Sequence, residues 1–243
     1  MREISEWIQA SRYTVLMTGA GMSTESGLPD FRSADGLWNN KNPAELASVN
    51  ALTNNREEFI AFYKERMKVI AETKPNMGHY YLAEWEKAEK IQGVITQNVD
   101  GLHQAAGSRR VAELHGSLTA LHCYSCSERY DYTKYLRDEI TCSSCGGFLR
   151  PDVVLFGEML PDEAISFSQQ HTANADLFIV LGSSLSVSPA SYFPQDAKQN
   201  GARLVIINHT ETELDSIADK VIQGRNISDV LSSIDVLFDE SLK

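Results

Sequence analysis

Long apolar runs are missing from this sequence of 243 residues. A membrane-spanning helix needs about 20 consecutive apolar residues, and no stretch approaches that length. The N-terminal stretch MREISEWIQASRYTVLM mixes charged with apolar residues and offers no small-residue cleavage site, which argues against a secretory signal. We therefore expect a soluble, cytoplasmic protein without a membrane partner.

Basic residues are also scarce, with 22 Lys and Arg against 33 Asp and Glu and a formal net charge of −11. Such a charge repels a phosphate backbone, and basic residues form at most pairs, such as Arg109 and Arg110. We expect no nucleic-acid partner. A basic partner such as a lysine-rich protein tail would be attracted, although acidic charge can also serve solubility alone.

Internal repeats and low-complexity segments are absent as well, and almost no sequence extends beyond the predicted core. Hydrophobic residues make up 42% of the chain and charged residues 23%, as in ordinary globular proteins. The length allows one full α/β unit or one domain with a substantial insertion. We expect a single domain, 1–243, that acts as a monomer.

Only four cysteines are present, in the pattern C-x2-C-x15-C-x2-C. Each pair can close a tight turn with both sulfurs on one side, so the two pairs can supply four thiolates to one zinc ion. The ligands would be Cys123, Cys126, Cys142 and Cys145. Four thiolates leave no open coordination position, so the ion would be structural. Disulfides and a redox dithiol are the alternatives; the missing secretory signal weighs against the first, and the duplicated motif against the second.

Four short apolar runs have the composition of strands that are covered on both faces. They span residues 13–18, 91–96, 176–182 and 203–208. Helical patterns lie between them, and a weaker strand and a closing helix follow. These elements span 76–90, with Asn76 as the cap, 162–174, 220–223 and 227–240. Alternation of strand and helix predicts an α/β fold with a Rossmann-like parallel sheet.

Two stretches interrupt this alternation and predict a smaller module beside the sheet. One is rich in helix-forming residues and spans about 35–75, and the other carries the cysteines and spans about 120–150. The large lobe would then comprise about 1–34, 76–119 and 151–243, with a cleft between it and the smaller zinc-binding and helical module.

Polar residues follow each predicted strand, where ligands bind in an open α/β sheet. The stretches are GAGMSTESGLPDFRS, QNVDGLH, SSLSVSP and HTETE. Gly19, Ala20 and Gly21 can form a tight turn that lets backbone amides approach a pyrophosphate. The third glycine of the common dinucleotide fingerprint is missing, because Thr24 stands in its place. This disfavours an ordinary dehydrogenase and leaves a nucleotide cleft of another design.

The ordered motifs of this chain resemble those of the sirtuins, a family of NAD-dependent protein-lysine deacylases. They cover almost the whole chain and are GAGMSTESGLPDFRS, TQNVDGLHQAAGS, ELHG, the paired C-x2-C motifs, VVLFGE, GSSLSV and IN. The resemblance implies a Rossmann-like lobe beside a zinc-binding lobe, with NAD as a co-substrate and one structural zinc ion.

The resemblance also implies how NAD is held. The GAG turn and Arg32 would hold the phosphates, Phe31 would shield the nicotinamide end from water, and Asp100 would accept from the carboxamide. Amide and carboxylate groups suit these partners, because a ribose and a carboxamide carry no charge. The expected NAD contacts are Gly19, Ala20, Gly21, Glu25, Asp30, Phe31, Arg32, Gln97, Asn98, Asp100, His115, Gly182, Ser183, Ser184 and Asn208. Glu25, Asp30 and Ser23 could instead cap helices.

Catalysis would fall to His115 as the general base, with Asn98 beside it. The resemblance implies that the acyl oxygen of a modified lysine attacks the anomeric carbon of the ribose, that nicotinamide leaves, and that His115 takes a proton from a ribose hydroxyl. The products would be free lysine, nicotinamide and 2′-O-acyl-ADP-ribose. Two alternatives are a mono-ADP-ribosyltransferase on the same scaffold and a zinc-ribbon binding module without catalysis.

The stretch VVLFGE has the apolar alternation of an edge strand. In sirtuins the corresponding segment pairs with the extended substrate peptide and adds it as a strand. We therefore expect Val153, Phe156, Gly157 and Glu158 to contact the substrate, with the apolar members walling a tunnel for the lysine stem.

The choice of acyl group rests on two residues of a predicted helix. Tyr63 and Arg66 stand three apart and so share one helix face. They resemble the Y-x-x-R pair of the sirtuin branch that removes succinyl and malonyl groups, whereas Asp30 resembles the deacetylase pattern. The alternative is that Arg66 is a solvated helix residue and Tyr63 belongs to the core. We expect a deacetylase of acyl-lysine proteins that also accepts acidic acyl groups.

Overall fold

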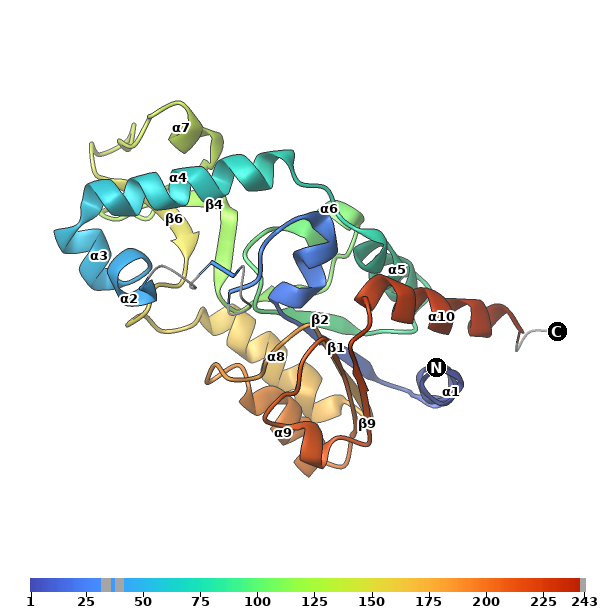
Figure 1. Cartoon of the computed structure of the whole chain (residues 1–243). Coiled ribbons are helices and arrows are strands. Elements are labelled where there is room, and N and C mark those ends of the chain that lie inside the picture. Colours follow the sequence, from blue (N-terminus) through green and yellow to red (C-terminus); the bar gives the residue numbers. More distant parts are fainter. Residues whose placement is uncertain (32–35, 38–41, 241–243) are drawn as a thin grey trace.

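A parallel sheet of six strands runs through the computed structural model, which describes residues 1–31, 36–37 and 42–240 (Figure 1). Its strand order is β3-β2-β1-β7-β8-β9. The strands are β1 (Thr14–Thr18), β2 (Gly93–Thr96), β3 (Val111–Glu113), β7 (Leu177–Leu181), β8 (Arg203–Asn208) and β9 (Lys220–Gln223). This order confirms the Rossmann-like sheet. From β1 the chain adds strands towards one edge of the sheet, and from β7 it adds them towards the other edge. Such sheets bind their ligands at this switch point between β1 and β7.

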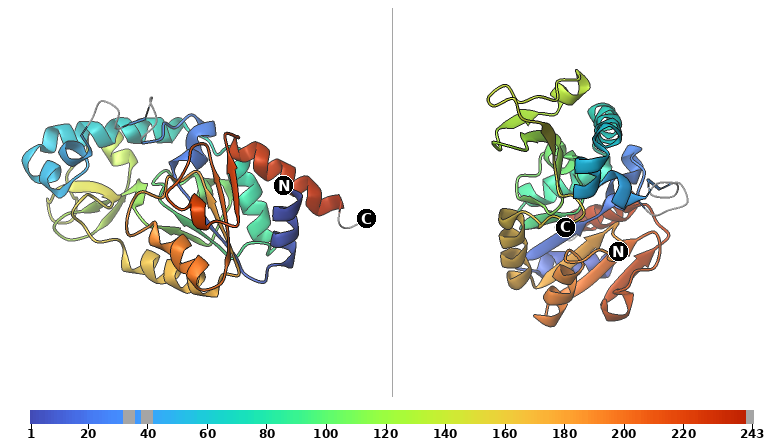
Figure 2. Two further views of the ribbon diagram at one scale, coloured as in Figure 1. Left: turned by 60° about the horizontal axis from the view of Figure 1, so that its bottom comes forward. Right: turned by 90° about the vertical axis from the view of Figure 1, so that its left-hand side faces the viewer.

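Helices cover both faces of this sheet, so its central strands are buried along their whole length. Leu16 of β1 belongs to an apolar cluster with α1, α5 and α10, and its neighbour Val15 belongs to one with α8 and α9. The helices are α1 (Arg2–Ala10), α5 (Met77–Lys87), α8 (Asp162–Asn174), α9 (Tyr192–Gln199) and α10 (Ile227–Glu240). Figures 1 and 2 show both termini on the side of α1 and α10. Within the described ranges, no helix is both long and apolar enough to cross a membrane.

A smaller antiparallel sheet with the order β5-β4-β6 packs beneath a helical segment. Its strands are β4 (Gly116–Cys123), β5 (Arg129–Asp131) and β6 (Leu149–Val153), and the helices near it are α2 (Pro43–Leu46), α3 (Val49–Asn54), α4 (Arg56–Glu72) and α7 (Thr133–Leu136). Phe59, Tyr63 and Met67 of α4 lie about one turn apart and share a core with Leu121 and Leu149. Helical and cysteine-bearing segments, far apart in sequence, therefore bury one apolar surface together, as Figure 1 shows for α4 above β4 and β6.

Most predicted elements lie where the sequence placed them. The structure has α8, β8, β9 and α10 at the expected residues, and Asn76 caps α5, where its Oδ1 accepts from the His79 amide at 3.3 Å. The sequence analysis missed α1, β3 and α9. It also missed the short helices α6 (Leu102–Ala106), η1 (Ala20–Ser26) and η2 (Asp215–Ile217). Short elements such as β3 have too few residues to show a periodic pattern.

The predicted edge strand at 153–158 is wrong beyond Val153, where β6 ends. In the segment that follows, the bonded backbone amides donate to different neighbours. Val154 donates to His115 O at 2.9 Å and Phe156 donates to Ala47 O at 2.9 Å. Separate partners replace a regular ladder, so residues 154–158 form a loop of defined shape between the two sheets.

Candidate active site

A cavity of about 970 Å³ opens at the carboxyl ends of the central strands, between the two sheets. The predicted site residues that line it are Ala20, Gly21, Glu25, Asp30, Phe31, Tyr63, Arg66, Gln97, Asn98, His115, Val153, Phe156, Gly157, Glu158, Gly182, Ser183, Ser184 and Asn208. A second cavity of about 410 Å³ shares Ala20, Phe31, Arg66 and Asn98 with the first and adds Asp100. Gly19 lines neither cavity, and Arg32 lies outside the described residues.

Three glycines let the loops after β1 and β7 interlock at the floor of the cavity. A Cβ on Gly19 would lie 2.7 Å from Gly182 O, and one on Gly21 would lie 2.8 Å from Gly182 Cα. Gly182 itself has a φ of +63°, and its Cβ would lie 2.4 Å from the Met22 amide nitrogen. The amides of Gly19 and Gly21 donate to Leu181 O and Gly182 O at 3.0 and 2.9 Å. These glycines thus serve loop packing, and their amides are already bonded within the protein.

His115 follows β3 and faces the cavity in a defined tautomer. Its Nδ1 lies 3.0 Å from Gln97 O, and a carbonyl oxygen only accepts, so Nδ1 carries the proton. Burial lowers the pKa of His115, and the hydrogen bond to Gln97 opposes that shift only in part. The imidazole is therefore neutral at pH 7, with a lone pair on Nε2 that can accept a proton.

The polar residues after β2 form a buried network behind His115. Asn98 Nδ2 donates to Gly19 O at 3.0 Å and to Ser23 Oγ at 3.1 Å. Ser23 Oγ donates in turn to Asp100 Oδ2 at 2.7 Å, and Leu102 N donates to Asp100 Oδ1 at 2.9 Å. Ser23 therefore joins the two predicted NAD residues and does not cap a helix. Burial raises the pKa of Asp100, although these hydrogen bonds lower it in part.

Gln97 keeps one donor without a partner. Its Oε1 accepts from Ser183 Oγ at 3.1 Å, which ties the end of β2 to the loop after β7. Its Nε2 is buried and, across the described part of the chain, has no hydrogen-bond partner. An unpaired buried donor is costly, so this amide suits a ligand oxygen such as a ribose hydroxyl.

Tyr63 and Arg66 lie together at the cavity wall. Tyr63 is buried, and burial raises its pKa to about 12. The Arg66 guanidinium lies 5.6 Å from the ring centroids of both Phe31 and Phe62 and 6.0 Å from that of Tyr63. Within the described residues, no carboxylate forms an ion pair with it. Tyr63 thus belongs to the core, as one alternative held, while Arg66 points into the cavity and is not a solvated helix residue.

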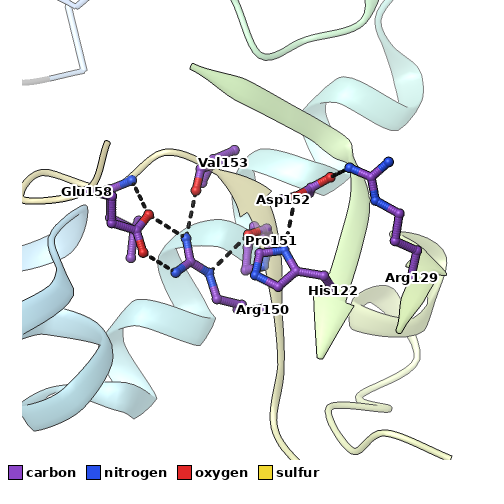
Figure 3. Close-up of polar contacts among 8 residues, drawn as sticks. His122, Arg129, Arg150, Pro151, Asp152, Val153 and Glu158 are labelled. Carbon is purple, nitrogen blue, oxygen red and sulfur yellow. Dashed lines mark hydrogen bonds and ion pairs between the residues drawn. The ribbon is translucent and has the colours of Figure 1, made fainter. Parts of the chain in front are cut away.

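Two predicted contact residues have partners inside the protein. Glu25 Oε1 accepts from Ser228 N at 3.0 Å, in the first turn of α10, so Glu25 acts at least in part as a helix cap. Glu158 pairs with Arg150, and Figure 3 shows both of its carboxylate oxygens turned towards that guanidinium. Neither carboxylate is simply free for a ligand.

The sequence analysis missed the part of the cavity nearest β9. Arg225, Asn226 and Ile227 line it there; His209 and Thr210, which also line the cavity, belong to the HTETE stretch that the sequence analysis noted after its fourth strand. Polar residues directly after β9 were a usable signal, because β9 is a parallel strand and its carboxyl end meets the same edge of the sheet. Because β9 has weak apolar character, the sequence analysis did not look for ligand-binding residues after it.

The four cysteines converge outside the cavity. Their sulfur atoms all lie within 4.8 Å of one another, with Cys123 and Cys145 at 3.5 Å and Cys126 and Cys142 at 3.7 Å. Zinc bonds of about 2.3 Å in a tetrahedron place sulfurs about 3.8 Å apart, so the set fits one zinc ion. None of the four lines either cavity, which agrees with a structural role.

Comparison with known proteins assigns the family. Residues 19–189 match the Sir2 family, and the chain belongs to it. It is 54% identical over 232 residues to an NAD-dependent protein deacetylase of Oceanobacillus iheyensis, which covers 95% of this chain and 98% of that protein. It is 55% identical to NAD-dependent protein deacetylase 1 of Geobacillus kaustophilus, with 95% and 96% covered.

Solved structures of similar proteins share the whole fold. A mutant Sir2 homologue in complex with ADP-ribose superposes with a TM-score of 0.93 at 38% identity, covering 99% of this chain and 97% of that one. A complex of Sir2, p53 peptide and NAD+ superposes with a TM-score of 0.88 at 36% identity, covering 100% and 99%. The expected architecture is therefore confirmed over the full length of the described chain.

Proposed function

We propose that the protein removes acetyl groups from lysine side chains of proteins, with NAD as the co-substrate. One observation carries the proposal: His115 presents an unprotonated Nε2 to a dinucleotide-type cavity, with Gln97 and Asn98 beside it. The deacetylases of Oceanobacillus and Geobacillus, more than half identical to this chain, support it.

The cavity residues fit NAD in an extended pose across the sheet. Ser183, Ser184 and Asn208 lie where the adenosine half would bind, at the ends of β7 and β8. Gln97 Nε2 would donate to a ribose hydroxyl, because it is buried and unpaired by the described residues. Asp100, in the second cavity, would accept from the nicotinamide carboxamide. Two lobes built on the two sheets would enclose the ligand between them.

Bound NAD supplies a ribose carbon that an acyl oxygen can attack as nicotinamide leaves. His115 Nε2 would then take the proton of a ribose hydroxyl, while Gln97 O holds the imidazole in position through Nδ1. Asn98 would orient the ribose, since its Nδ2 is fixed by Gly19 O and Ser23 Oγ. Phe31, half-buried at the junction of the two cavities, would keep water from the reacting carbon.

The acylated lysine would enter beside residues 153–158. Val153 and Leu155 are buried, whereas Phe156 is 56% exposed at the edge of the cavity. This arrangement supports an apolar wall for the lysine stem, with Phe156 at its mouth. The complex of Sir2 with p53 peptide and NAD+ supports a peptide substrate at this site.

Arg66 favours a second candidate activity, the removal of acidic acyl groups. Its guanidinium faces the cavity without an ion-paired carboxylate in the described part of the chain; three aromatic rings surround it, and the Asp100 carboxylate acts on it from a longer distance. A succinyl or malonyl carboxylate could pair with it. We therefore keep the broader deacylase as an extension of the proposal.

Nicotinamide release tests both activities. With NAD and an acetyl-lysine peptide, we expect turnover by the wild type and a loss of at least about 100-fold in His115→Ala, since general base catalysis contributes about that much or more. Arg66→Ala should lose turnover of the succinyl peptide alone. Unchanged turnover in His115→Ala would remove the mechanism, and ADP-ribose found on protein by mass spectrometry would favour a transferase.

We also propose a cytoplasmic monomer without a nucleic-acid partner; the charge of −11 supports the monomer and the lack of contact with nucleic acid. Light scattering should give the mass of one chain. Binding of duplex DNA at physiological salt would contradict the last part.

A further inference from the structure

Arg150 is a buried arginine that neither cavity touches. It is the second residue of β6, and its side chain is 2% exposed although a guanidinium is always charged. The guanidinium donates from Nη1 to Glu158 Oε1 at 2.5 Å and from Nη2 to Glu158 Oε2 at 3.0 Å (Figure 3). Nη2 also donates to Val153 O at 2.7 Å, and Nε donates to Pro151 O at 3.3 Å. One side chain thus joins the last residues of β6 to the far end of the following loop.

Glu158 is the carboxylate that stabilises the charge of the buried Arg150 guanidinium. Its Oε2 also accepts from Leu155 N at 2.8 Å, so the carboxylate closes the loop upon itself. Burial acts to raise the pKa of Glu158, but the hydrogen bonds from Arg150 and Leu155 outweigh it and bring the pKa below its ordinary value. A buried charge persists where a partner and hydrogen bonds satisfy it, and Arg150 has both, although the Glu158 side chain is itself 29% exposed.

The loop between these residues connects to the rest of the active site. Val154 N donates to His115 O, and Phe156 exchanges backbone hydrogen bonds with Ala47 O and Val49 N at 2.9 and 3.2 Å. Gly157 follows, with a φ of +98°. Its backbone N–H and C=O have no partner within the described residues. A loop segment with unpaired backbone groups is thus held at the cavity edge, between Phe156 and the 91% exposed Met159.

We propose that Arg150 is a positioning residue for the protein substrate: its ion pair with Glu158 holds the 154–158 loop in the shape that offers the backbone N–H and C=O of Gly157 to the peptide. The inference rests on the proposed function. It also changes the role of Glu158, whose carboxylate serves the loop and does not contact the peptide. Lysine could not replace Arg150, because one ammonium cannot bond both carboxylate oxygens and two carbonyls in this planar arrangement.

The first test is a set of variants assayed with an acetyl-lysine peptide. Glu158→Gln and Arg150→Lys should raise KM for the peptide about tenfold with a much smaller change in kcat, because a bidentate charged hydrogen bond is lost. The dissociation constant of ADP-ribose, measured by calorimetry, should stay within about twofold. Asp152→Asn is the matched control, since Asp152 lies on β6 like Arg150 but forms its ion pair with the 76% exposed Arg129 of β5 (Figure 3). It should leave the peptide KM unchanged.

A double variant separates positioning from stability. Loss of one partner strands a buried charge, whereas replacement of both by apolar side chains often leaves stability intact. Arg150→Met with Glu158→Leu should therefore melt higher than Arg150→Met or Glu158→Leu alone, although Val153 O and Leu155 N lose their partners, and it should keep the raised peptide KM. An unchanged peptide KM in the double variant would overturn the inference, as would an equal loss of ADP-ribose affinity.

Amide hydrogen exchange tests, without relying on activity, whether the Arg150–Glu158 ion pair acts as a clamp on the 154–158 loop. Val154 and Phe156 donate to His115 O and Ala47 O, and both amides should exchange at least about tenfold faster in Glu158→Gln. Faster exchange in a protein whose wild type shows no NAD-dependent deacetylation would support the clamp and contradict the proposed function. Equal exchange rates in variant and wild type would contradict the clamp itself.

Discussion

A single backbone carbonyl decides which nitrogen of His115 can act as a base. Gln97 O accepts from Nδ1, so the proton resides there and Nε2 keeps its lone pair. Gln97 and His115 follow β2 and β3, which pair in parallel, and that pairing brings the carbonyl to the ring. The chemical role of the histidine thus depends on a contact between two loops.

Tyr130 has a comparable influence on the zinc ligands. Its hydroxyl lies 3.1 Å from Cys142 Sγ and can donate to the thiolate. We predict that Tyr130→Phe loses zinc to a chelator about tenfold faster, since hydrogen bonds from surrounding residues orient metal ligands and stabilise their charge. Absorbance of the chelator complex measures the release.

Tyr132→Phe is the control for this experiment. The Tyr132 side chain packs beside the same apolar core, and no hydrogen bond joins its hydroxyl to a cysteine in the described chain. Equal release rates for Tyr130→Phe, Tyr132→Phe and the wild type would show that the Tyr130 hydroxyl does not stabilise the site.

Among the elements, the loops after β1 and β7 depend most on small residues. Gly21 and Gly182 approach so closely that a methyl group on Gly21 would lie 2.8 Å from Gly182 Cα. We predict that Gly21→Ala lowers the free energy of unfolding by about 2 kcal/mol, because overpacking forces backbone shifts. ADP-ribose affinity should fall as well, since both loops line the cavity. Urea unfolding and calorimetry measure the two effects.

Gly27→Ala provides the comparison. Gly27 ends η1 with a φ of +89°, and a Cβ there would meet nothing within 4 Å. It should cost about 1 kcal/mol from backbone strain and leave ADP-ribose affinity intact. If both variants bind ADP-ribose like the wild type, the close packing of the loops after β1 and β7 does not shape the cavity.

At the scale of the whole molecule, buried histidines make stability depend on pH. Burial lowers the pKa of His79 to about 4 and that of His103 to about 3, below the ordinary value of 6.5. Between pH 6.5 and these values the unfolded chain binds more protons than the folded one, so stability falls as pH falls through this window. Asp100 and Glu113 oppose the trend, because burial raises their pKa values.

We predict a loss of about 1–3 kcal/mol in the free energy of unfolding between pH 7 and pH 5. Urea unfolding at both values measures it. Acid also weakens zinc binding. Wild type and His79→Asn hold the same zinc site, so the difference between their losses of stability reports the contribution of His79. The variant should lose less stability over this interval, and an identical slope would contradict the role of His79.

The sequence predicted β1, β2, β7 and β8 well because these strands are buried on both faces and show unbroken apolar runs. It predicted the zinc ligands because two tight turns fix their spacing locally. It failed at 154–158, where apolar alternation resembles a strand but the amides bond to His115 and Ala47. Arg225 and Asn226 were missed because the strand before them is only partly buried.

By itself, the sequence determined the four central strands with their main helices and the metal ligands, since these depend on patterns among near neighbours, whereas the residues expected around the cavity came from the resemblance to the sirtuins. Only the tertiary structure decided what each polar group bonds. In the fold, Glu158 accepts hydrogen bonds from Arg150, and Glu25 accepts one from the Ser228 amide. The amides of Gly19 and Gly21 donate to carbonyl groups of the protein itself. Hydrogen bonds between segments far apart in sequence form only when the fold brings those segments together, so no local pattern records them.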